Sequence, residues 1–457
     1  MDFQLSPPQM RFLRDQHRSA LFLAGIGSGK THVGCLWALC QSATPSVGLL
    51  GAQNPSQLNS VVIKCFAAML DQAGINYCYG SEPPWFKSRF ERHSNILSLS
   101  TGTQVLAASM HESGADRTLR GTELNWAYLD ETRDMSEDVY HMVLGRMRAR
   151  GGPHHVRLTS TPRGHDWAWR LFVDQPGQDR GITRATTMDN RHLPPGYAES
   201  LKSQYSSDLY RQEVLGEIVN MGTGRACPAF DRARHVSPCP FAPGLPLILG
   251  LDFNVSPMAG VVCQRQGDSL RVIDELWIQD NAQTRQLVAI LAGRYASKSP
   301  EVHHVSDASG LSRNTKTLDT DAAILDAELR RAFRRVVNLQ VGHNPRVVDR
   351  VNSLNTLLDP ASGGTRIAID PRCTHLCADL ESVSWLPGDY GSLDKGDPMT
   401  GHIFDALGYV THRLFPVGGG KSWGLDGSLD PVQRPVDPRG AKFPMIQPVL
   451  LPAKGVQ

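Results

Sequence analysis

One segment near the start of the chain limits the possible folds more than any other. Residues Ala24–Thr31 read AGIGSGKT, and they stand between an apolar run at 20–24 and a helical pattern at 30–40. In such a glycine-rich turn, backbone N–H groups can surround phosphates, while Lys30 reaches the β- and γ-phosphates and Thr31 binds Mg²⁺. The segment predicts an α/β domain with a nucleotide site. The first position holds alanine instead of the usual glycine, and an ordinary turn before a helix is the competing interpretation.

Short apolar runs alternate with helical patterns through the first third of the chain. Apolar runs bounded by turn residues predict buried strands, and longer runs with helical periodicity predict helices. Such an alternation is typical of an α/β domain whose sheet is mainly parallel. The expected strands are 20–24, 47–51, 126–129 and 156–159, and the expected helices are 30–40 and 57–74.

One of the expected strands ends in two acidic residues. The segment 126–131 reads WAYLDE, so Asp130 and Glu131 stand at the carboxyl end of an apolar strand. Next to bound phosphates, Asp130 would hold Mg²⁺ and Glu131 would polarise the attacking water. Alone, the pair would read as a solvated strand end. With a phosphate loop upstream, it indicates nucleotide hydrolysis rather than nucleotide binding alone.

Weaker signals surround this predicted site. The segment 158–162 (LTSTP) places Thr161 at a strand end, where its hydroxyl could sense the γ-phosphate or the chain could simply turn. Gln9 precedes the first strand, and its amide could read adenine or lie on the surface. Phosphoryl transfer also needs positive charge on its transition state. Several arginines are available and the sequence does not choose among them: Arg117, Arg120, Arg146, Arg148 and Arg163.

A second pattern of strands and helices follows a less regular segment. Residues 166–242 contain several prolines and one helix-like stretch near 195–218, which indicates a connector. From residue 416 the chain is rich in Gly and Pro, a composition typical of a segment that forms no core. The strands expected between these segments are 245–253, 270–276 and 303–307, and the expected helices are 321–336 and 402–414.

Three aspartates stand out in this second α/β region. Asp252 ends the strand LILGLD, Asp307 ends HHVSD, and Asp405 lies in the otherwise apolar helix HIFDALGY. An acid on an apolar helix face is costly to bury unless it is paired or bound to a metal. If the three converge, they could hold two Mg²⁺ or Mn²⁺ ions for phosphodiester cleavage. Strand-end aspartates also serve as ordinary caps, and spacing alone does not decide.

Composition limits the class of protein. Lys and Arg total 47 against 45 Asp and Glu, a net charge of +2, which excludes a histone-like polycation but allows a basic groove. The chain shows no signal-peptide pattern and no apolar run long enough to span a membrane. Its nine cysteines are scattered, which favours reduced intracellular thiols, and Cys373–Cys377 lacks a second ligand pair for zinc.

In their order along the chain, these motifs resemble the large terminase subunit of tailed bacteriophages, a DNA-packaging motor with an attached nuclease. The resemblance covers residues 5–415, and it rests on the ordered set rather than on any single motif. The motifs are GIGSGKT, LRGTELNWAYLDE, TSTPRG, LGLDFN, SDASG and HIFDALGY, with YRQEVLGEIV and NPRVVDRVNSLNTLL as further similar segments.

The resemblance implies an α/β protein with two catalytic domains. The first is an N-terminal P-loop ATPase domain of the ASCE, RecA-like type, and the second is a C-terminal RNase H-like nuclease domain. We expect the ATPase core at 1–170, a connector at 171–242, the nuclease at 243–415 and a flexible tail at 416–457.

The resemblance also assigns roles to residues. In the ATPase, Asp130 is the metal-binding acid, Glu131 the catalytic base, and Thr161 part of the motif that couples hydrolysis to movement. Many relatives carry an arginine where this chain has Ile26, which favours Arg120 acting from a neighbouring subunit. The implied nucleotide contacts are Gln9, Gly25, Gly27, Ser28, Gly29, Lys30, Thr31, Asp130 and Thr161, and the implied metal ligands are Thr31 and Asp130 in the ATPase and Asp252, Asp307 and Asp405 in the nuclease.

The same resemblance implies ATP and Mg²⁺ as cofactors, with Mn²⁺ as an alternative in the nuclease site. Double-stranded DNA, a portal protein and a small terminase subunit are the implied partners. The subunits would form a pentameric ring on the procapsid, in the host cytoplasm and at the portal vertex, and would be absent from the mature virion. Two alternatives stay open: a helicase fused to a nuclease, and a DNA- and portal-binding assembly protein with degenerate active sites.

Overall fold

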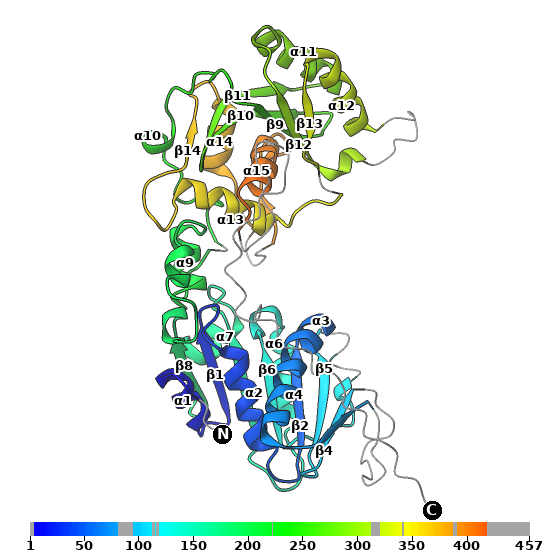
Figure 1. Ribbon diagram of the computed structural model, residues 1–457, viewed down its shortest axis with the longest axis vertical. Helices are drawn as coiled ribbons and strands as arrows, with labels where there is room; N and C mark the ends of the chain where they lie inside the picture. The colour runs from blue at the N-terminus through cyan, green and yellow to red at the C-terminus, as the bar shows by residue number, and fades with distance from the viewer. Residues whose placement is uncertain are drawn as a thin grey trace, which may run out of the picture.

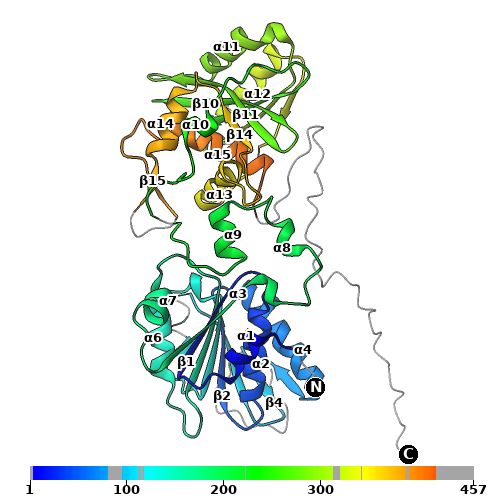
Figure 2. The same ribbon diagram turned by 90° about the vertical axis from the view of Figure 1, so that its left-hand side faces the viewer.

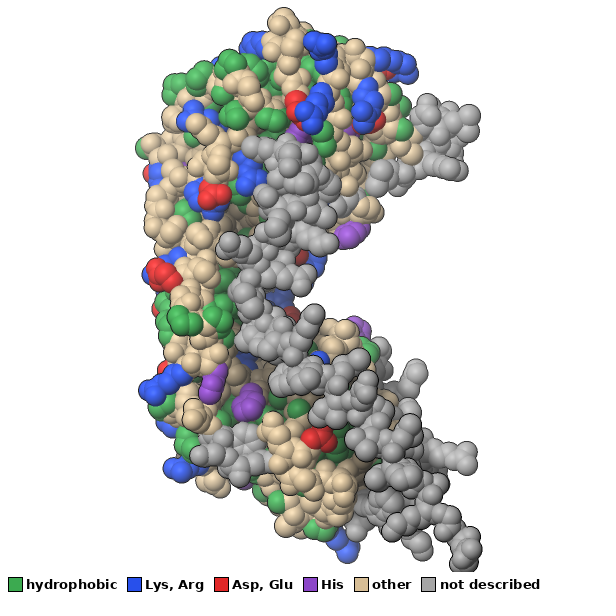
Figure 3. Space-filling model, in the orientation of Figure 1, with side chains coloured by type: hydrophobic (Ala, Val, Ile, Leu, Met, Phe, Trp, Pro, Cys, Tyr) green, Lys and Arg blue, Asp and Glu red, His purple; other side chains and the backbone are tan. Residues whose placement is uncertain are grey.

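Two α/β lobes lie one above the other along the long axis of the molecule (Figure 1). A narrower segment that carries two short helices joins them, and the surface is hollowed between the lobes on one side (Figure 3). This computed structural model describes residues 4–80, 95–111, 115, 118–221, 223–311, 320–340, 342–386 and 391–417. The expected tail at 416–457 therefore lies, apart from its first two residues, outside the described residues.

The N-terminal lobe is built on an eight-stranded sheet with the order β3-β4-β5-β2-β6-β7-β1-β8. The strands from β5 to β8 in this order run parallel, and β3 and β4 form an antiparallel edge. All four strands expected here are present, as β1, β2, β6 and β7. The bounds are β1 Ser19–Ala24, β2 Val47–Ala52, β3 Tyr77–Tyr79, β4 Ile96–Leu99, β5 Gln104–Ser109, β6 Trp126–Asp130, β7 His155–Ser160 and β8 Arg180–Ala185.

Helices cover both faces of this sheet (Figure 2), because strands of a parallel sheet are apolar on both sides. α2 and α4 pack on one face, in a core that includes Phe66 and Tyr128, and α6 and α7 cover the other, near Tyr140 and Phe172. The helix expected at 57–74 begins with a π-helical turn before α4. The bounds are α1 Pro7–Arg14, α2 Lys30–Gln41, α3 Pro55–Gln57, the π-helical turn Leu58–Ile63, α4 Lys64–Ala73, α6 Glu137–Arg146 and α7 Trp167–Trp169.

The C-terminal lobe has a six-stranded sheet with the order β13-β12-β9-β10-β11-β14. β9, β10 and β11 are antiparallel neighbours, while β12 and β13 run parallel to β9. Three antiparallel strands followed by two parallel ones are the arrangement of an RNase H-like sheet, here with β14 added beside β11. The bounds are β9 Leu247–Asp252, β10 Met258–Gln266, β11 Ser269–Ile278, β12 Val302–Ser306, β13 Val336–Asn338 and β14 Ile367–Ile369.

The helix expected at 402–414 is present with these bounds as α15, and it packs against the central strand β9. α13 and α14 lie on the same side of the sheet in one core with α15, and α11 and α12 pack in a second core. The helix expected at 321–336 ends at Ala332, and the chain then enters β13. The bounds are α11 Thr284–Tyr295, α12 Asp321–Ala332, α13 Val347–Leu358, α14 Thr374–Ser382 and α15 His402–Leu414, with a small hairpin of β15 Ser384–Trp385 and β16 Leu393–Asp394.

The connecting segment differs from its sequence-based prediction in two respects. The stretch near 195–218 forms two short helices, α8 (Tyr197–Ser200) and α9 (Ser207–Glu213), instead of one long helix. Ser206 caps the start of the second helix, since its hydroxyl accepts a hydrogen bond from the backbone N–H of Leu209. β8 also falls inside the expected connector at 171–242, although it pairs with β1 as the edge strand of the first sheet.

Gly250 allows α15 to approach β9 closely. A Cβ atom at this position would lie 2.4 Å from Val410 Cγ2 and 2.5 Å from the carbonyl oxygen of Ala406. We expect Gly250→Ala to destabilise the C-terminal lobe by about 1–3 kcal/mol, because the helix would have to move away from the strand. Chemical unfolding followed by tryptophan fluorescence would measure this. Gly293→Ala in α11 is the matched control, since its Cβ would meet nothing within 4 Å. Equal stability of the two variants would contradict the expectation.

Within the described ranges no helix combines the length and the apolar character that crossing a membrane requires. All nine cysteines are free thiols. Cys373 and Cys377 are buried in the core around α14.

Candidate active sites

The expected phosphate loop directly follows β1, and its residue Lys30 is the first residue of α2. Its side chain is buried, and Nζ donates hydrogen bonds to the carbonyl oxygens of Ala24 (3.2 Å) and Gly25 (3.1 Å). Gly27 and Gly29 have φ angles of 67° and 83°, which glycine adopts without strain. The loop thus forms a turn around a single buried ammonium group, the arrangement needed to present that charge to a phosphate.

Asp130 and Thr31, the two expected Mg²⁺ ligands of the ATPase, are in contact. The Thr31 hydroxyl donates to the Asp130 carboxylate at 3.1 Å, and Thr159 Oγ1 and Tyr128 OH donate to it at 2.7 and 2.6 Å. Burial raises the pKa of Asp130, the charge of Glu131 raises it further, and these three hydrogen bonds oppose the rise. Three oriented donors thus stabilise a buried carboxylate directly beside the phosphate loop.

Glu131 has a strained backbone. Its φ angle is 51°, in the left-handed region that residues other than glycine seldom occupy. Its Oε1 lies 3.5 Å from Lys30 Nζ, and its Oε2 accepts from the backbone N–H of Thr161 at 3.4 Å. Strain of this kind persists where the surrounding structure enforces it, and it is concentrated at functional sites.

The strand β7 brings Thr161 to the same place. β7 lies between β1, which leads into the phosphate loop, and β6, which ends in the acid pair. The Thr161 hydroxyl, just beyond β7, accepts a hydrogen bond of 2.9 Å from Lys30 Nζ. The order of the sheet therefore places the predicted coupling motif between the two halves of the nucleotide site.

Gln9 contacts the phosphate loop instead of an open surface. Its Nε2 donates to the carbonyl oxygen of Ser28 at 3.1 Å, while its Oε1 accepts from the backbone N–H of Ser6 in a capping box at the start of α1. The amide is thus fixed beside the loop. Arg120 is exposed. The adenine contact of Gln9 and the transition-state role of Arg120 are not tested by these positions.

Arg133 is a site residue that the sequence analysis missed. Its Nη1 donates to Glu213 Oε1 at 2.8 Å, and its Nε lies 3.9 Å from Glu131 Oε2. Burial opposes the protonated form of Arg133, but the neighbouring charges of Glu213 and Glu131 raise its pKa overall. The only sequence signal was its position two residues after Glu131.

The connector also closes on the phosphate loop. The backbone N–H of Ile26 donates to the carbonyl oxygen of Glu213 at 2.6 Å, and Thr187 Oγ1 donates to the carbonyl oxygen of Ile26 at 2.7 Å. Asn190 Nδ2 donates to the carbonyl oxygen of Gly27 at 2.6 Å. Backbone groups of the loop are therefore bound to the segment that leads to the second lobe.

In the C-terminal lobe, three elements bring the expected aspartates to one end of the sheet. Asp252 is the last residue of β9, and Asp307 directly follows the neighbouring strand β12. Asp405 lies in the first turn of α15. The charges of all three carboxylates raise the pKa of Tyr409, after the larger effect of burial. The three acids thus lie in the neighbourhood of one tyrosine.

Each aspartate has partners of its own. Asp405 accepts from Arg350 Nη1 at 2.8 Å and from Lys395 Nζ at 2.6 Å, and Asp252 shares a 2.8 Å hydrogen bond with His402. Burial alone would raise the pKa of Asp307, but hydrogen bonds from the residues around it lower the pKa overall. The donors to Asp307 are the hydroxyl and backbone N–H of Ser309 and the side-chain amide of Asn344.

That the three carboxylates hold metal ions stays a prediction. Nowhere in the described part of the chain do three His, Cys, Asp or Glu side chains form a group that could hold a metal ion. The reason is local, because Arg350 and Lys395 hold the Asp405 carboxylate. The donor set nonetheless fits divalent cations. Burial raises the pKa of Asp252, the hydrogen bond with His402 opposes this, and the charge of Asp405 adds to it. Bound divalent cations would relieve this repulsion between oxygen ligands.

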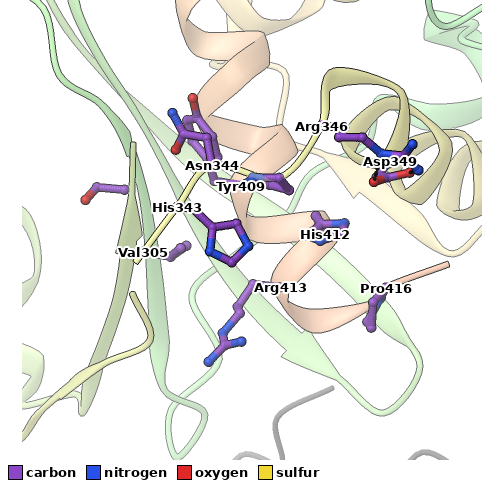
Figure 4. Close-up of a pocket in the computed structure, with 11 residues that line it drawn as sticks. Val305, His343, Asn344, Arg346, Asp349, Tyr409, His412, Arg413 and Pro416 are labelled. Carbon is purple, nitrogen blue, oxygen red and sulfur yellow. Dashed lines mark hydrogen bonds and ion pairs between the residues drawn. The ribbon is translucent and has the colours of Figure 1, made fainter. Parts of the chain in front are cut away.

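A basic cavity of about 340 Å³ adjoins Asp307. Figure 4 shows His343 beside it, with His412 and Arg413 reaching in from the last turn of α15. Ser306 and Asn344 also line it, and Asn344 is the residue whose amide donates to Asp307. The cavity therefore adjoins Asp307 through Asn344.

Asp379 fixes the start of α15 and predicts a pH-dependent stability. Its Oδ2 accepts from the backbone N–H groups of Gly401 (2.8 Å) and Phe404 (3.3 Å), and burial raises its pKa to about 6. Because the unfolded carboxyl titrates near pH 4, the folded state binds this proton more tightly, and the group lowers stability by up to about 3 kcal/mol as the pH rises from about 4 to above 6. Asp379→Asn retains an acceptor oxygen and should lose this dependence. Urea unfolding of both proteins at about pH 4, 5 and 7 would measure it; parallel curves would contradict the prediction.

Comparison with known proteins agrees with this geometry. Residues 21–233 match the family described as terminase large subunit, T4likevirus-type, N-terminal. No curated relative matches the sequence. One structure of the large terminase from a thermophilic bacteriophage has a TM-score of 0.61 to this chain, with 17% identity, and the match covers 91% of this chain and 100% of that one.

Two further structures of the same phage terminase contain nucleotides. The complex with ADP has a TM-score of 0.58 and the complex with ATP-gamma-S one of 0.56, each at 17% identity and over 89% of this chain. They cover 99% and 98% of the phage protein. Both lobes therefore follow the fold of one known protein, a large terminase. Residues 21–233 are thus similar to the large terminase family, and the chain as a whole has the fold of a large terminase subunit.

Proposed function

We propose that this protein hydrolyses ATP to drive double-stranded DNA into a procapsid and cuts that DNA in its second lobe. The observation that carries the proposal is the presence of two separate acidic centres on one chain. One lies beside a phosphate loop, and the other lies at the end of an RNase H-like sheet. The ATPase core is proposed at 1–170, the connector at 171–242 and the nuclease at 243–415.

In the first lobe, Lys30 would contact the β- and γ-phosphates of ATP, and its bond to Thr161 would be exchanged for a phosphate contact. Thr31 and Asp130 would hold Mg²⁺, whose charge offsets that of the phosphate oxygens. Glu131 would orient a water and accept its proton as the water oxygen bonds to the γ-phosphorus and the bond to the β-phosphate oxygen breaks. Arg120 of a neighbouring subunit would add positive charge, and Gln9 would contact adenine.

In the second lobe, Asp252, Asp307 and Asp405 would hold two Mg²⁺ or Mn²⁺ ions, which supply an activated water and charge for the leaving oxygen in phosphodiester cleavage. Asn344 and His402 would orient Asp307 and Asp252. The basic cavity beside Asp307 would bind backbone phosphates of the strand being cut, a contact that does not depend on base sequence.

The proposed partners follow from this activity. Both activities would act on double-stranded DNA. The protein would work as a pentameric ring of copies at the procapsid vertex, together with a portal protein and a small terminase subunit. A helicase fused to a nuclease would require a second RecA-like lobe, and the second sheet has instead three antiparallel strands beside two parallel ones.

The test measures both activities on one preparation of the full-length protein. ATP hydrolysis is followed by phosphate release, and cleavage of supercoiled plasmid is followed with Mg²⁺, with Mn²⁺ and with EDTA. We expect hydrolysis with Mg²⁺ and cutting that EDTA abolishes. A protein that neither hydrolyses ATP nor cuts DNA with either metal would fit the degenerate assembly protein instead. DNA cleavage without ATP hydrolysis would contradict the proposed packaging activity and leave the proposed nuclease.

A further inference from the structure

Both carboxylate oxygens of Asp405 are occupied by cations of the chain itself. Arg350 Nη1 lies 2.8 Å from Oδ1, and Lys395 Nζ lies 2.6 Å from Oδ2. The Asp405 side chain is 10% exposed, so these contacts replace water at a nearly buried group. Each oxygen keeps a second lone pair, but the two positive charges beside the carboxylate oppose the binding of a further cation.

The two cations differ in how firmly they are held. Arg350 comes from the first turn of α13, is 9% exposed, and lies over the ring of Tyr409 with its Cζ 4.6 Å from the centroid. Lys395 comes from the short segment between β16 and α15 and is 33% exposed. A lysine ammonium on a flexible stem is readily rehydrated, whereas a buried, stacked guanidinium is not. Lys395 is therefore the exchangeable partner.

The charges at the site favour this exchange. With Arg350 and Lys395 in place and His402 neutral, the three carboxylates of Asp252, Asp307 and Asp405 keep one uncompensated negative charge. When Lys395 leaves, they keep two. A positive charge about 4 Å from an incoming cation also opposes its binding by direct repulsion. When Lys395 leaves, Asp405 Oδ2 becomes available as a ligand, and the more negative charge of the site attracts a divalent cation more strongly.

We propose that Lys395 competes with the divalent cation for Asp405 and thereby sets the metal concentration at which the nuclease site assembles. Arg350 stays in place and keeps the Asp405 carboxylate oriented while Lys395 is displaced into solvent. The inference rests on the proposed nuclease function, since it requires Asp405 to be a metal ligand. Lys395 acts through Asp405 and is a positioning residue.

The experiment measures Mn²⁺ binding to the full-length protein without nucleotide, by the electron paramagnetic resonance signal of free Mn²⁺. Lys395→Met removes the charge and keeps an unbranched side chain to pack beside Gly401. Lys298→Met is the matched control, because Lys298 lies over Phe241 and Tyr295, away from the three acids. Asp405→Asn identifies which part of the binding belongs to the nuclease site.

We expect Lys395→Met to tighten Mn²⁺ binding by about tenfold and to leave a larger Mn²⁺-induced rise in the unfolding midpoint than in the parent protein. Lys298→Met should match the parent. Equal or weaker binding by Lys395→Met, while Asp405→Asn still loses binding, would overturn the competition and leave the nuclease function intact. If Asp405→Asn binds Mn²⁺ as the parent does, Asp405 is no ligand, and the proposed nuclease site itself fails.

Discussion

ATP hydrolysis is expected to fall by about 10²- to 10⁴-fold in Glu131→Gln, while ATP still binds. The amide keeps the size of the side chain and can still accept from the Thr161 N–H, but it cannot take a proton from water. Lys30 and the Thr31–Asp130 pair, which would contact the nucleotide, are unchanged. Steady-state phosphate release would measure hydrolysis, and a fluorescent ATP analogue would measure binding.

Glu123→Gln serves as the control for this prediction. Glu123 is 55% exposed in the same lobe and pairs with Arg148 on the surface, so its variant should hydrolyse ATP at the parent rate. Undiminished hydrolysis by Glu131→Gln would remove Glu131 from the role of base. Loss of both binding and hydrolysis would point to a damaged fold, which the unfolding midpoint of the variant would reveal.

DNA cleavage is expected to fall by more than about 100-fold in Asp252→Asn, with ATP hydrolysis unchanged. Substitution of groups that only orient metal ligands typically costs about 10- to 100-fold, and removal of a ligand charge should cost more. Asp252 ends the central strand β9 and is nearly buried, so the amide keeps its place. Conversion of supercoiled plasmid to nicked and linear forms in Mn²⁺ would measure the loss.

The control for the second prediction is Asp268→Asn. Asp268 is 86% exposed in the turn between β10 and β11, and its variant should cut plasmid as the parent does. Equal cutting by Asp252→Asn and the parent would exclude Asp252 from the site. Hydrolysis reports whether the N-terminal lobe of each variant is folded, and the unfolding midpoint reports on the C-terminal lobe that carries the substitution.

The parts of this structure that could be predicted from sequence are those whose signal is local. A strand, a glycine loop and a helix in succession identify the phosphate loop, because each residue acts on its immediate neighbours. The helix at 402–414 was predicted with its observed bounds, since its apolar face continues to the last turn. Asp405 was recognisable because an apolar helix face is an unusual place for an acid, whereas Asp252 and Asp307, at strand ends, were assigned through the resemblance.

What the sequence did not reveal are contacts between segments far apart in the chain. Arg133 meets Glu213 and Lys395 meets Asp405 because the fold brings them together, and surface arginines and lysines carry no mark of such partners. For the same reason the sequence carried no sign that Arg350 and Lys395 would hold the Asp405 carboxylate. The sequence analysis missed the antiparallel edge strands β3 and β4. Both strands are short, and only their pairing with neighbouring strands identifies them as part of the sheet.

Backbone hydrogen bonds join the connector to both lobes. At one end its Glu213 is bonded to the backbone of the phosphate loop, and at the other the backbone N–H of Ser207 donates to the carbonyl oxygen of Asp359, at the end of α13. The backbone N–H of Ala361 donates a second hydrogen bond, to the carbonyl oxygen of Tyr205. α13 is the helix that carries Arg350, the fixed partner of Asp405. Because the two anchoring residues Ser207 and Glu213 are the first and last residues of α9, a displacement of the phosphate loop would reach the end of α13 through a short helix rather than through an unstructured segment.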